Sequence, residues 1–424
     1  MRQLLSAKFD TVESIPGHLT EKQISVGLKL STPDVIEDIE SGKGGVVSRV
    51  RWKIDRYLGA RRDYIDESDP SSSAKQILDR NQSHPALEGL CRSIQSADAV
   101  VVDGDGSLVL RDQPGRMLHL SMAIIHLSNH FNTPVHYVNS IFSDSSVTGR
   151  NEQYIGVVVD ALRMCSTVML RDPESVDLLR EAAPDIACEM VPDSLFAWFD
   201  QSADWVQEMP LNGDMVVPHG QETSRILGSL DFSGDYICIS GGSRAAGRRE
   251  EAKERYTSLV EKIKTLGYPV YLVPTCRGDA FLEEVSRRTN TPMVPVQISV
   301  SMGTAILANA RLLLSGRYHP SIMAALGGTP CVFFQADSHK ALSLQRLLGY
   351  ETPKQFSAAP SPDELDALLK EAQDLLGAGE DLRCHLKSHA EKQYLASLKL
   401  PGLVYDATVR ATGRVPVKEA SVAS

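Results

Sequence analysis

Residues 97–106 read ADAVVVDGDG, and no other stretch of the chain indicates its fold class as clearly. The apolar run 99–102 is unbroken, and it ends in Asp103 and a polar loop that contains two glycines. A strand that is buried on both faces of a parallel sheet is a continuous apolar run, whereas a half-exposed strand alternates. The stretch therefore predicts a buried parallel strand at 99–103 that leads into a flexible loop.

The same pattern recurs along most of the chain, with short apolar runs separated by stretches of helical periodicity. We expect strands at 134–138, 168–170, 188–191, 236–240, 270–273, 312–314 and 331–334. Helices are expected at 116–130, at 256–267, and from Pro320 to the Gly327-Gly328 pair. Alternation of this kind builds parallel sheets covered by helices. The fold class we predict is α/β, with two Rossmann-like domains facing a central cleft.

The domain boundary is expected where the sequence becomes polar and rich in glycine and proline, around 200–230. We predict an N-terminal domain at 1–220 with an insertion near 41–85, a C-terminal domain at 221–400 and a tail at 401–424 that is frayed from 416. Smaller features are a weak strand at 4–7, a capping box at 20–23 and a short helix at 52–58.

Composition excludes several classes of protein. The 424 residues include 44 Lys plus Arg and 54 Asp plus Glu, a net charge of −10, which disfavours nucleic acid as a partner. Seven scattered cysteines without a Cys-x-x-Cys pair, and no signal-like apolar run, favour a cytoplasmic location. The arginines of 41–85 leave two interpretations open, contact with an anionic glycan or membrane surface, and an ordinary solvated face.

In an open parallel sheet, ligands bind at the carboxyl ends of the strands. The side chains that follow predicted strands and carry positive charge or hydrogen-bond donors are Arg171, Ser243, Arg244, Arg317, His319, His339 and Lys340. An acidic chain therefore concentrates cations at the expected cleft. This arrangement suits a substrate that carries a carboxylate or a phosphate.

The sequence GRYHP at 316–320 is the most specific of these features. Arg317 can bind an oxyanion through two parallel hydrogen bonds, and His319 can exchange a proton near neutral pH. The alternative is that Arg317 forms a structural ion pair and His319 caps a strand. In LRDPES at 170–175, we expect Asp172 to be a helix N-cap and Pro173 the first helical residue.

Weaker candidates each have a structural alternative. The GGSR loop at 241–244 could bind phosphate or form a plain turn. Asp103, Asp105 and Asp193 could orient a sugar hydroxyl or cap loops. His126 and His130 have the spacing of metal ligands on a helix, but we identify no third ligand and expect no protein-bound metal.

Taken in order, four motifs resemble the polysaccharide pyruvyl transferase family: ADAVVVDGDG (97–106), LRDPES (170–175), VPDSLF (191–196) and GRYH (316–319) followed by GTP (328–330). The resemblance covers roughly residues 95–350. It implies a glycosyltransferase-B-like fold and transfer of pyruvate from phosphoenolpyruvate to sugar hydroxyls, which forms a ketal. The acceptor implied is a cell-surface or exopolysaccharide glycan or its precursor, lipid-linked or nucleotide-linked, with no cofactor.

By this resemblance, Arg171, Arg317 and His319 are active-site residues, with the arginines on the two anionic groups of phosphoenolpyruvate and His319 as general acid or base. Tyr318 stands where the family often has leucine. The other substrate-binding candidates are Ser243, Arg244, Asp105, His339, Lys340 and His18.

The chain departs from the family at two loops. A Gly-Asn-x-Gly-Asp type loop is replaced by IPGHLT at 15–20, which contains His18, and the glycine-rich loop reads DGDG at 103–106. Both departures concern acceptor recognition.

Two rival functions share this fold. One is a glycosyltransferase whose nucleotide-sugar donor places its diphosphate at 241–244. The other is a non-catalytic carbohydrate-binding or assembly protein. The oligomeric state is open, and so is peripheral association with a membrane.

Overall fold

The computed structural model describes residues 1–9, 12, 65, 69–83, 85–207, 221–247 and 249–414. The capping box at 20–23, the loop with His18 and the helix expected at 52–58 lie outside these residues. The gap at 208–220 contains the last residues of the predicted N-terminal domain, so the boundary at 220 remains a prediction.

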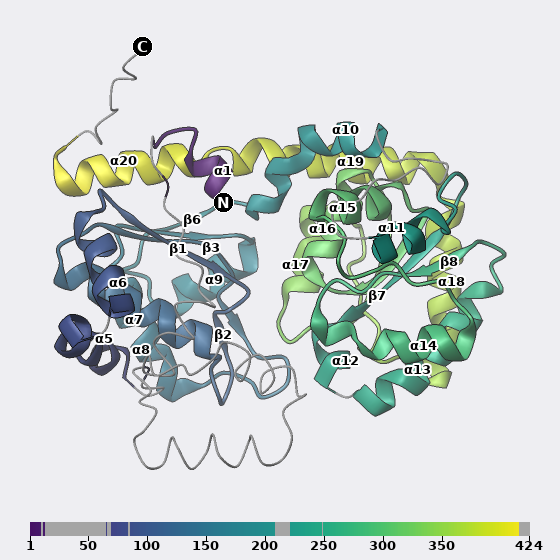
Figure 1. Cartoon of the computed structure of the whole chain (residues 1–424), viewed down its shortest axis with the longest axis horizontal. Coiled ribbons are helices and arrows are strands. Elements are labelled where there is room, and N and C mark those ends of the chain that lie inside the picture. The colour runs from purple at the N-terminus through teal and green to yellow at the C-terminus, as the bar shows by residue number, and fades with distance from the viewer. Residues whose placement is uncertain are drawn as a thin grey trace.

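Two parallel four-stranded sheets form the two halves of the molecule (Figure 1). The first has the order β1-β3-β5-β6, with strands Val100–Asp105, Val135–Ser140, Thr167–Leu170 and Cys188–Met190. The second has the order β10-β9-β7-β8, with strands Cys331–Phe333, Leu312–Gly316, Ile237–Gly242 and Val270–Leu272. A parallel pair, β2 (Val109–Leu110) and β4 (Ser143–Asp144), extends the first half. The predicted α/β fold with two Rossmann-like domains is confirmed.

Helices cover both faces of the first sheet because its strands are apolar on both sides. One face packs against α7 (Arg116–His130), α8 (Glu152–Leu162) and α9 (Pro173–Ala182). Beyond α7 lie α5 (Pro70–Arg80) and α6 (Pro85–Ser96), which bury Ile77, Leu87 and Ile94. Residues 70–80 of the predicted insertion are therefore part of the packed first half, since α5 presents apolar side chains to α7.

The second sheet is covered in the same way. One face packs against α12 (Ser243–Gly247), α13 (Arg249–Lys264), α14 (Phe281–Thr289) and α18 (Leu365–Gly377). The other face packs against α15 (Val300–Asn309), α16 (Tyr318–Leu326), α17 (Lys340–Leu347) and α19 (Gly379–Ser397). The connecting helices are α10 (Phe199–Gln207) and α11 (Gln221–Gly228).

The C-terminal segment returns to the first half, which the sequence did not indicate. Helix α20 (Leu400–Thr412) and the short helix α1 (Arg2–Leu5) lie together above the first sheet in Figure 1. Leu400 and Val404 of α20 are fully buried against Val138 and Met169. Burial of such side chains contributes roughly 1.5–3 kcal/mol each. The prediction that a tail begins at 401 is therefore wrong.

Two local predictions also need correction. Residues 4–7 belong to α1 and a turn, not to a strand, and their apolar side chain Leu5 is buried beneath α20. Helix α16 begins at Tyr318, two residues before Pro320, because the β9 strand turns directly into the helix after Arg317. Among the described residues, no helix has both the length and the apolar character needed to cross a membrane.

Candidate active site

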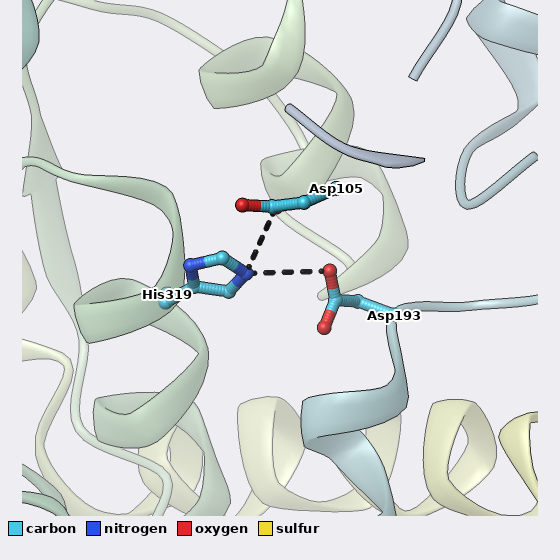
Figure 2. A group of neighbouring side chains, drawn as sticks. All are labelled: Asp105, Asp193 and His319. Carbon is cyan, nitrogen blue, oxygen red and sulfur yellow. Dashed lines mark ion pairs between the residues drawn. The ribbon is translucent and has the colours of Figure 1, made fainter. Parts of the chain in front are cut away.

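The ends of four strands bring one cluster of side chains together across the two halves (Figure 2). Asp105 is the last residue of β1, Arg171 follows β5, and Asp193 follows β6, all in the first half. His319 lies in the first turn of α16, after β9 of the second half. Carboxyl ends of parallel strands are where side chains from distant segments converge.

His319 joins the two halves. Its Nε2 atom lies 3.4 Å from Oδ1 of Asp105 and 3.5 Å from Oδ2 of Asp193. Burial on its own would lower the pKa of His319, but the nearby Asp193 and Asp105 carboxylates outweigh burial and raise this pKa above its ordinary value. The imidazole is therefore suited to carry a proton at neutral pH.

Arg171 is at the site but is not a free anion-binding group. Its side chain is 1 % exposed, and Nη1 donates to Asp105 at 2.7 Å and to Asp193 at 2.8 Å. Its guanidinium carbon lies 4.0 Å from the centre of the Tyr318 ring, a cation–π contact. Arg171 therefore forms ion pairs with two carboxylates of the protein, whereas the sequence led us to expect contact with a substrate anion.

Asp193 is the buried member of the cluster, with 1 % of its side chain exposed. Its Oδ1 accepts from the backbone N–H of Leu195 and caps the short helix η2 (Ser194–Trp198). Burial would raise the pKa of Asp193, but His319 and then Arg171 hold it well below its usual range. The VPDSLF motif indicated a loop cap or a hydroxyl-binding residue here, and the structure shows the cap.

Arg317 forms the structural ion pair that we had considered as its alternative. Its Nη2 and Nε atoms donate to Oδ1 of Asp279 at 2.6 and 3.2 Å. Asp279 is fully buried, and its Oδ2 accepts from the backbone and hydroxyl of Thr275. Asp279 was missed in the sequence because it lies in an irregular stretch without a recognisable motif.

The two glycines of the GGSR loop make room for this ion pair. A Cβ atom on Gly241 would collide with the carboxylate of Asp279. Gly242 packs against Gly316, where a Cβ on Gly316 would lie 3.0 Å from the Gly242 Cα. Arg244, from the same loop, donates to Gln335 at 3.0 Å. The two glycines therefore serve the close approach of β7 and β9, and the stretch is the end of β7 and the start of α12 instead of a plain turn.

We expect Gly241→Ala to displace Asp279 and thereby release Arg317. Overpacking of a well-packed interior usually costs about 1–3 kcal/mol, so the free energy of unfolding should fall by that amount in urea denaturation. Gly247→Ala is the matched control, because nothing lies within 4 Å of a Cβ at that position. Equal stability of the two variants would contradict this account of the loop.

His339 and Lys340 lie at the start of α17, and both are engaged within the protein. His339 Nε2 lies 3.0 Å from Oδ1 of Asp172 and 3.1 Å from Oγ of Ser175. Burial would raise the pKa of Asp172, but its bond with His339 lowers it. Asp172 also accepts from the backbone of Ser175, which confirms the predicted N-cap of α9. Lys340 pairs with Asp337 at 2.6 Å.

Further contacts hold the two halves together beside the cluster. Glu174 of α9 accepts hydrogen bonds from Ser343 and Arg346 of α17. The hydroxyl of Ser146 donates to the carbonyl oxygen of Ala336 at 2.8 Å. These interdomain contacts involve His339, α17 and the loop before it. They therefore help to fix the position of His319 relative to the first half.

A small hollow lies next to the cluster, at the carboxyl end of β9. Its lining residues include Arg317, Tyr318 and Lys340, together with the apolar side chains of Phe333 and Leu344. The N-terminus of a helix and two cationic side chains favour an anionic ligand. Ser243 and Arg244 do not line it.

Asp105, Asp193 and His319 could also be considered as metal ligands, because their ligand atoms all lie within 4.8 Å of one another. Nη1 of Arg171 already lies between the two carboxylates, where it neutralises them as a cation would. The expected absence of a bound metal stays a prediction.

Comparison with known proteins gives one family and one fold. The family model for polysaccharide pyruvyl transferase matches residues 42–338. Curated proteins give no match. Among solved structures, UDP-GlcNAc 2-epimerase from Neisseria meningitidis has a TM-score of 0.52 and 10 % identity, over 81 % of this chain and 83 % of that one. A similar structure from Listeria monocytogenes, a putative UDP-N-acetylglucosamine 2-epimerase, has a TM-score of 0.51 and 11 % identity, over 85 % of each chain. At such identities these two likenesses show the glycosyltransferase-B-like fold alone.

Proposed function

The chain belongs to the polysaccharide pyruvyl transferase family, and we propose that it moves the enolpyruvyl group of phosphoenolpyruvate onto two hydroxyls of a sugar, forming a pyruvate ketal. Membership of this family makes it a transferase. The observation that carries the proposal is the contact of His319, from the second half, with Asp105 and Asp193 of the first half. It places an acid/base group between two domains that can each bind one substrate.

We place the donor at the mouth of the hollow beside β9 because of the charge there. Phosphoenolpyruvate carries a carboxylate and a phosphate, and Arg317 and Lys340 line the hollow with positive charge. Asp279 engages Nη2 and Nε of Arg317, so Nη1 remains for a ligand, given that no described residue accepts a hydrogen bond from it. We assign donor binding to Arg317, Lys340 and the N-terminus of α16. Arg171 instead pairs with the carboxylates of Asp105 and Asp193.

His319 supplies the proton. The methylene carbon of phosphoenolpyruvate must gain one proton when a hydroxyl oxygen attacks the neighbouring carbon, and a general acid contributes roughly 10²- to 10⁴-fold to such a step. Because its carboxylate neighbours raise the pKa of His319, the imidazolium form that this role needs is more favoured than in an isolated histidine.

The acceptor we propose is a sugar of a cell-surface glycan or exopolysaccharide, or its lipid-linked or nucleotide-linked precursor. The Neisseria meningitidis structure is described as bound to UDP-GlcNAc. That description makes a nucleotide-linked sugar the first acceptor to test.

The test is incubation of the protein with phosphoenolpyruvate and a panel of UDP-sugars and lipid-linked sugars. We expect inorganic phosphate release that depends on the acceptor, and an acceptor whose mass increases by one pyruvate ketal. Transfer from a nucleotide sugar with nucleotide release, and no phosphate from phosphoenolpyruvate with any acceptor, would show a glycosyltransferase instead.

A further inference from the structure

Formation of a ketal from an enol ester requires more proton transfers than one imidazole performs. Two sugar hydroxyls each lose a proton, the methylene carbon gains one, and the departing phosphate takes the other. If His319 gives its proton to carbon in the first step, it cannot remove the proton of the first hydroxyl in that step. A second group must therefore act as the base.

Within the described part of the chain, the carboxylates of Asp105 and Asp193 face His319 (Figure 2), and they differ in exposure. Asp193 is 1 % exposed, and its oxygens are engaged by Arg171 and by the N–H of Leu195. The side chain of Asp105 is 57 % exposed. Its Oδ1 atom accepts from Arg171 Nη1 at 2.7 Å and lies 3.4 Å from His319 Nε2. Asp105 can therefore contact a substrate while it stays within reach of the imidazole.

The backbone of Asp105, which holds this carboxylate at the site, has a conformation that is unfavourable for most non-glycine residues. Its φ angle is +44°, in the left-handed region that favours glycine, and glycines flank it on both sides. Its carbonyl oxygen accepts from the backbone N–H of Ile141 at 3.0 Å, which fixes this conformation. A non-glycine residue in such a conformation is typical of functional sites.

We propose that Asp105 is the catalytic base for the acceptor, taking the proton from the first sugar hydroxyl that attacks phosphoenolpyruvate. This inference rests on the proposed function, because it assigns a residue to that reaction. It places the acceptor over the first half, at the end of β1, and the donor over the second half, at the end of β9.

The first hydroxyl oxygen bonds to C2 of phosphoenolpyruvate, its proton passes to Asp105, and C3 receives the proton of His319. The C2–O bond to phosphate then breaks, and the departing phosphate takes the proton from Asp105. The second hydroxyl oxygen bonds to C2 and its proton passes to His319. Both residues return to their starting states, and the products are the ketal and one inorganic phosphate.

Two substitutions of Asp105 test this assignment. Asp105→Asn keeps the shape and tolerates a positive φ but cannot accept a proton. Asp105→Gly removes the carboxylate at a backbone conformation that glycine adopts readily, so its Tm should not fall for backbone reasons. The matched control is Asp112→Asn, an exposed carboxylate in the loop that follows β2.

We expect kcat of Asp105→Asn, measured as phosphate release from phosphoenolpyruvate with the acceptor, to fall about 10²- to 10⁴-fold. The KM for phosphoenolpyruvate should stay within a fewfold of wild type, since the donor contacts lie in the second half. Asp112→Asn should behave as wild type.

The outcomes separate the two proposals. If wild type releases phosphate and Asp105→Asn or Asp105→Gly keeps kcat within fivefold of wild type, the assignment of Asp105 is overturned and the proposed function stands. If wild type releases no phosphate from phosphoenolpyruvate with any acceptor, the proposed function fails and this inference fails with it.

Discussion

His319→Gln should lower the rate of pyruvyl transfer about 10²- to 10⁴-fold while the protein remains folded. Glutamine can keep a hydrogen bond to Asp105 or Asp193, but it cannot give a proton to carbon or take one back. The measurement is phosphate release at saturating phosphoenolpyruvate, with far-UV circular dichroism as the check on folding. His130→Gln, at an exposed position in the last turn of α7, is the matched control. Turnover of His319→Gln within a fewfold of wild type would remove His319 from the mechanism.

The environment of His319 also fixes the direction of a pH effect. Its pKa is raised above the ordinary value of about 6.5, so the acid form persists to higher pH than in an isolated histidine and the rate should fall on the alkaline side. Asp193→Asn removes a negative charge 3.5 Å from Nε2, so the alkaline limb should move to lower pH. The pairing of His319 with the two carboxylates also stabilises the folded protein. This stabilisation is complete below about pH 6.5 and is lost as pH rises through the raised pKa of His319.

Much of this site could be predicted from sequence because its residues follow buried strands. The apolar run at 99–102, the LRDPES motif and the GRYHP motif each mark a strand end, and the carboxyl ends of parallel strands meet in one cleft. The N-cap at Asp172 could be predicted for a local reason, since the side chain of an aspartate before proline accepts from a backbone N–H of the helix that follows. His319 was identified in this way, and the structure places it at the centre of the cluster.

The partners of these residues could not be predicted, because they depend on tertiary packing. Arg171 meets Asp105 and Asp193 only because β1, β5 and β6 belong to one sheet. The link between Arg317 and Asp279 depends on a loop without periodicity. A cationic side chain after a strand looks the same in sequence whether it faces a ligand or an internal carboxylate. That ambiguity explains why Arg171 was expected to bind a substrate anion.

The position of helix α20 in the fold could not be predicted from sequence either. Its sequence carries an ordinary mixture of apolar and polar residues, and its own periodicity does not say which half it covers. The buried contacts of Leu400 and Val404 with the first sheet, and a 2.9 Å contact between Thr408 and His136, bring a segment from beyond the second half back to the first. Long-range returns of this kind leave no local signal in sequence.

Arg171→Met should destabilise the protein by about 3–5 kcal/mol, which is the usual cost of removing one partner from a buried ion pair. Asp193 would remain 1 % exposed and would keep only His319 as a positive neighbour. The measurement is urea denaturation at pH 7. A loss below about 1 kcal/mol, together with a large rise in the KM for phosphoenolpyruvate, would instead make Arg171 a donor ligand, as the sequence first suggested.

The double variant Arg171→Met/Asp193→Asn distinguishes a pair from two independent residues. If the guanidinium mainly neutralises Asp193, the double variant should lose less stability than the sum of the two single variants, because no buried charge is left unpaired. The pH dependence adds a second check with a definite sign. The pKa of Asp193 is depressed in the folded protein, so its stabilising contribution is present above about pH 4 and is lost as pH falls through the depressed value. In Arg171→Met that loss should begin at a higher pH, whereas strictly additive effects and an unchanged acid transition would contradict the pairing.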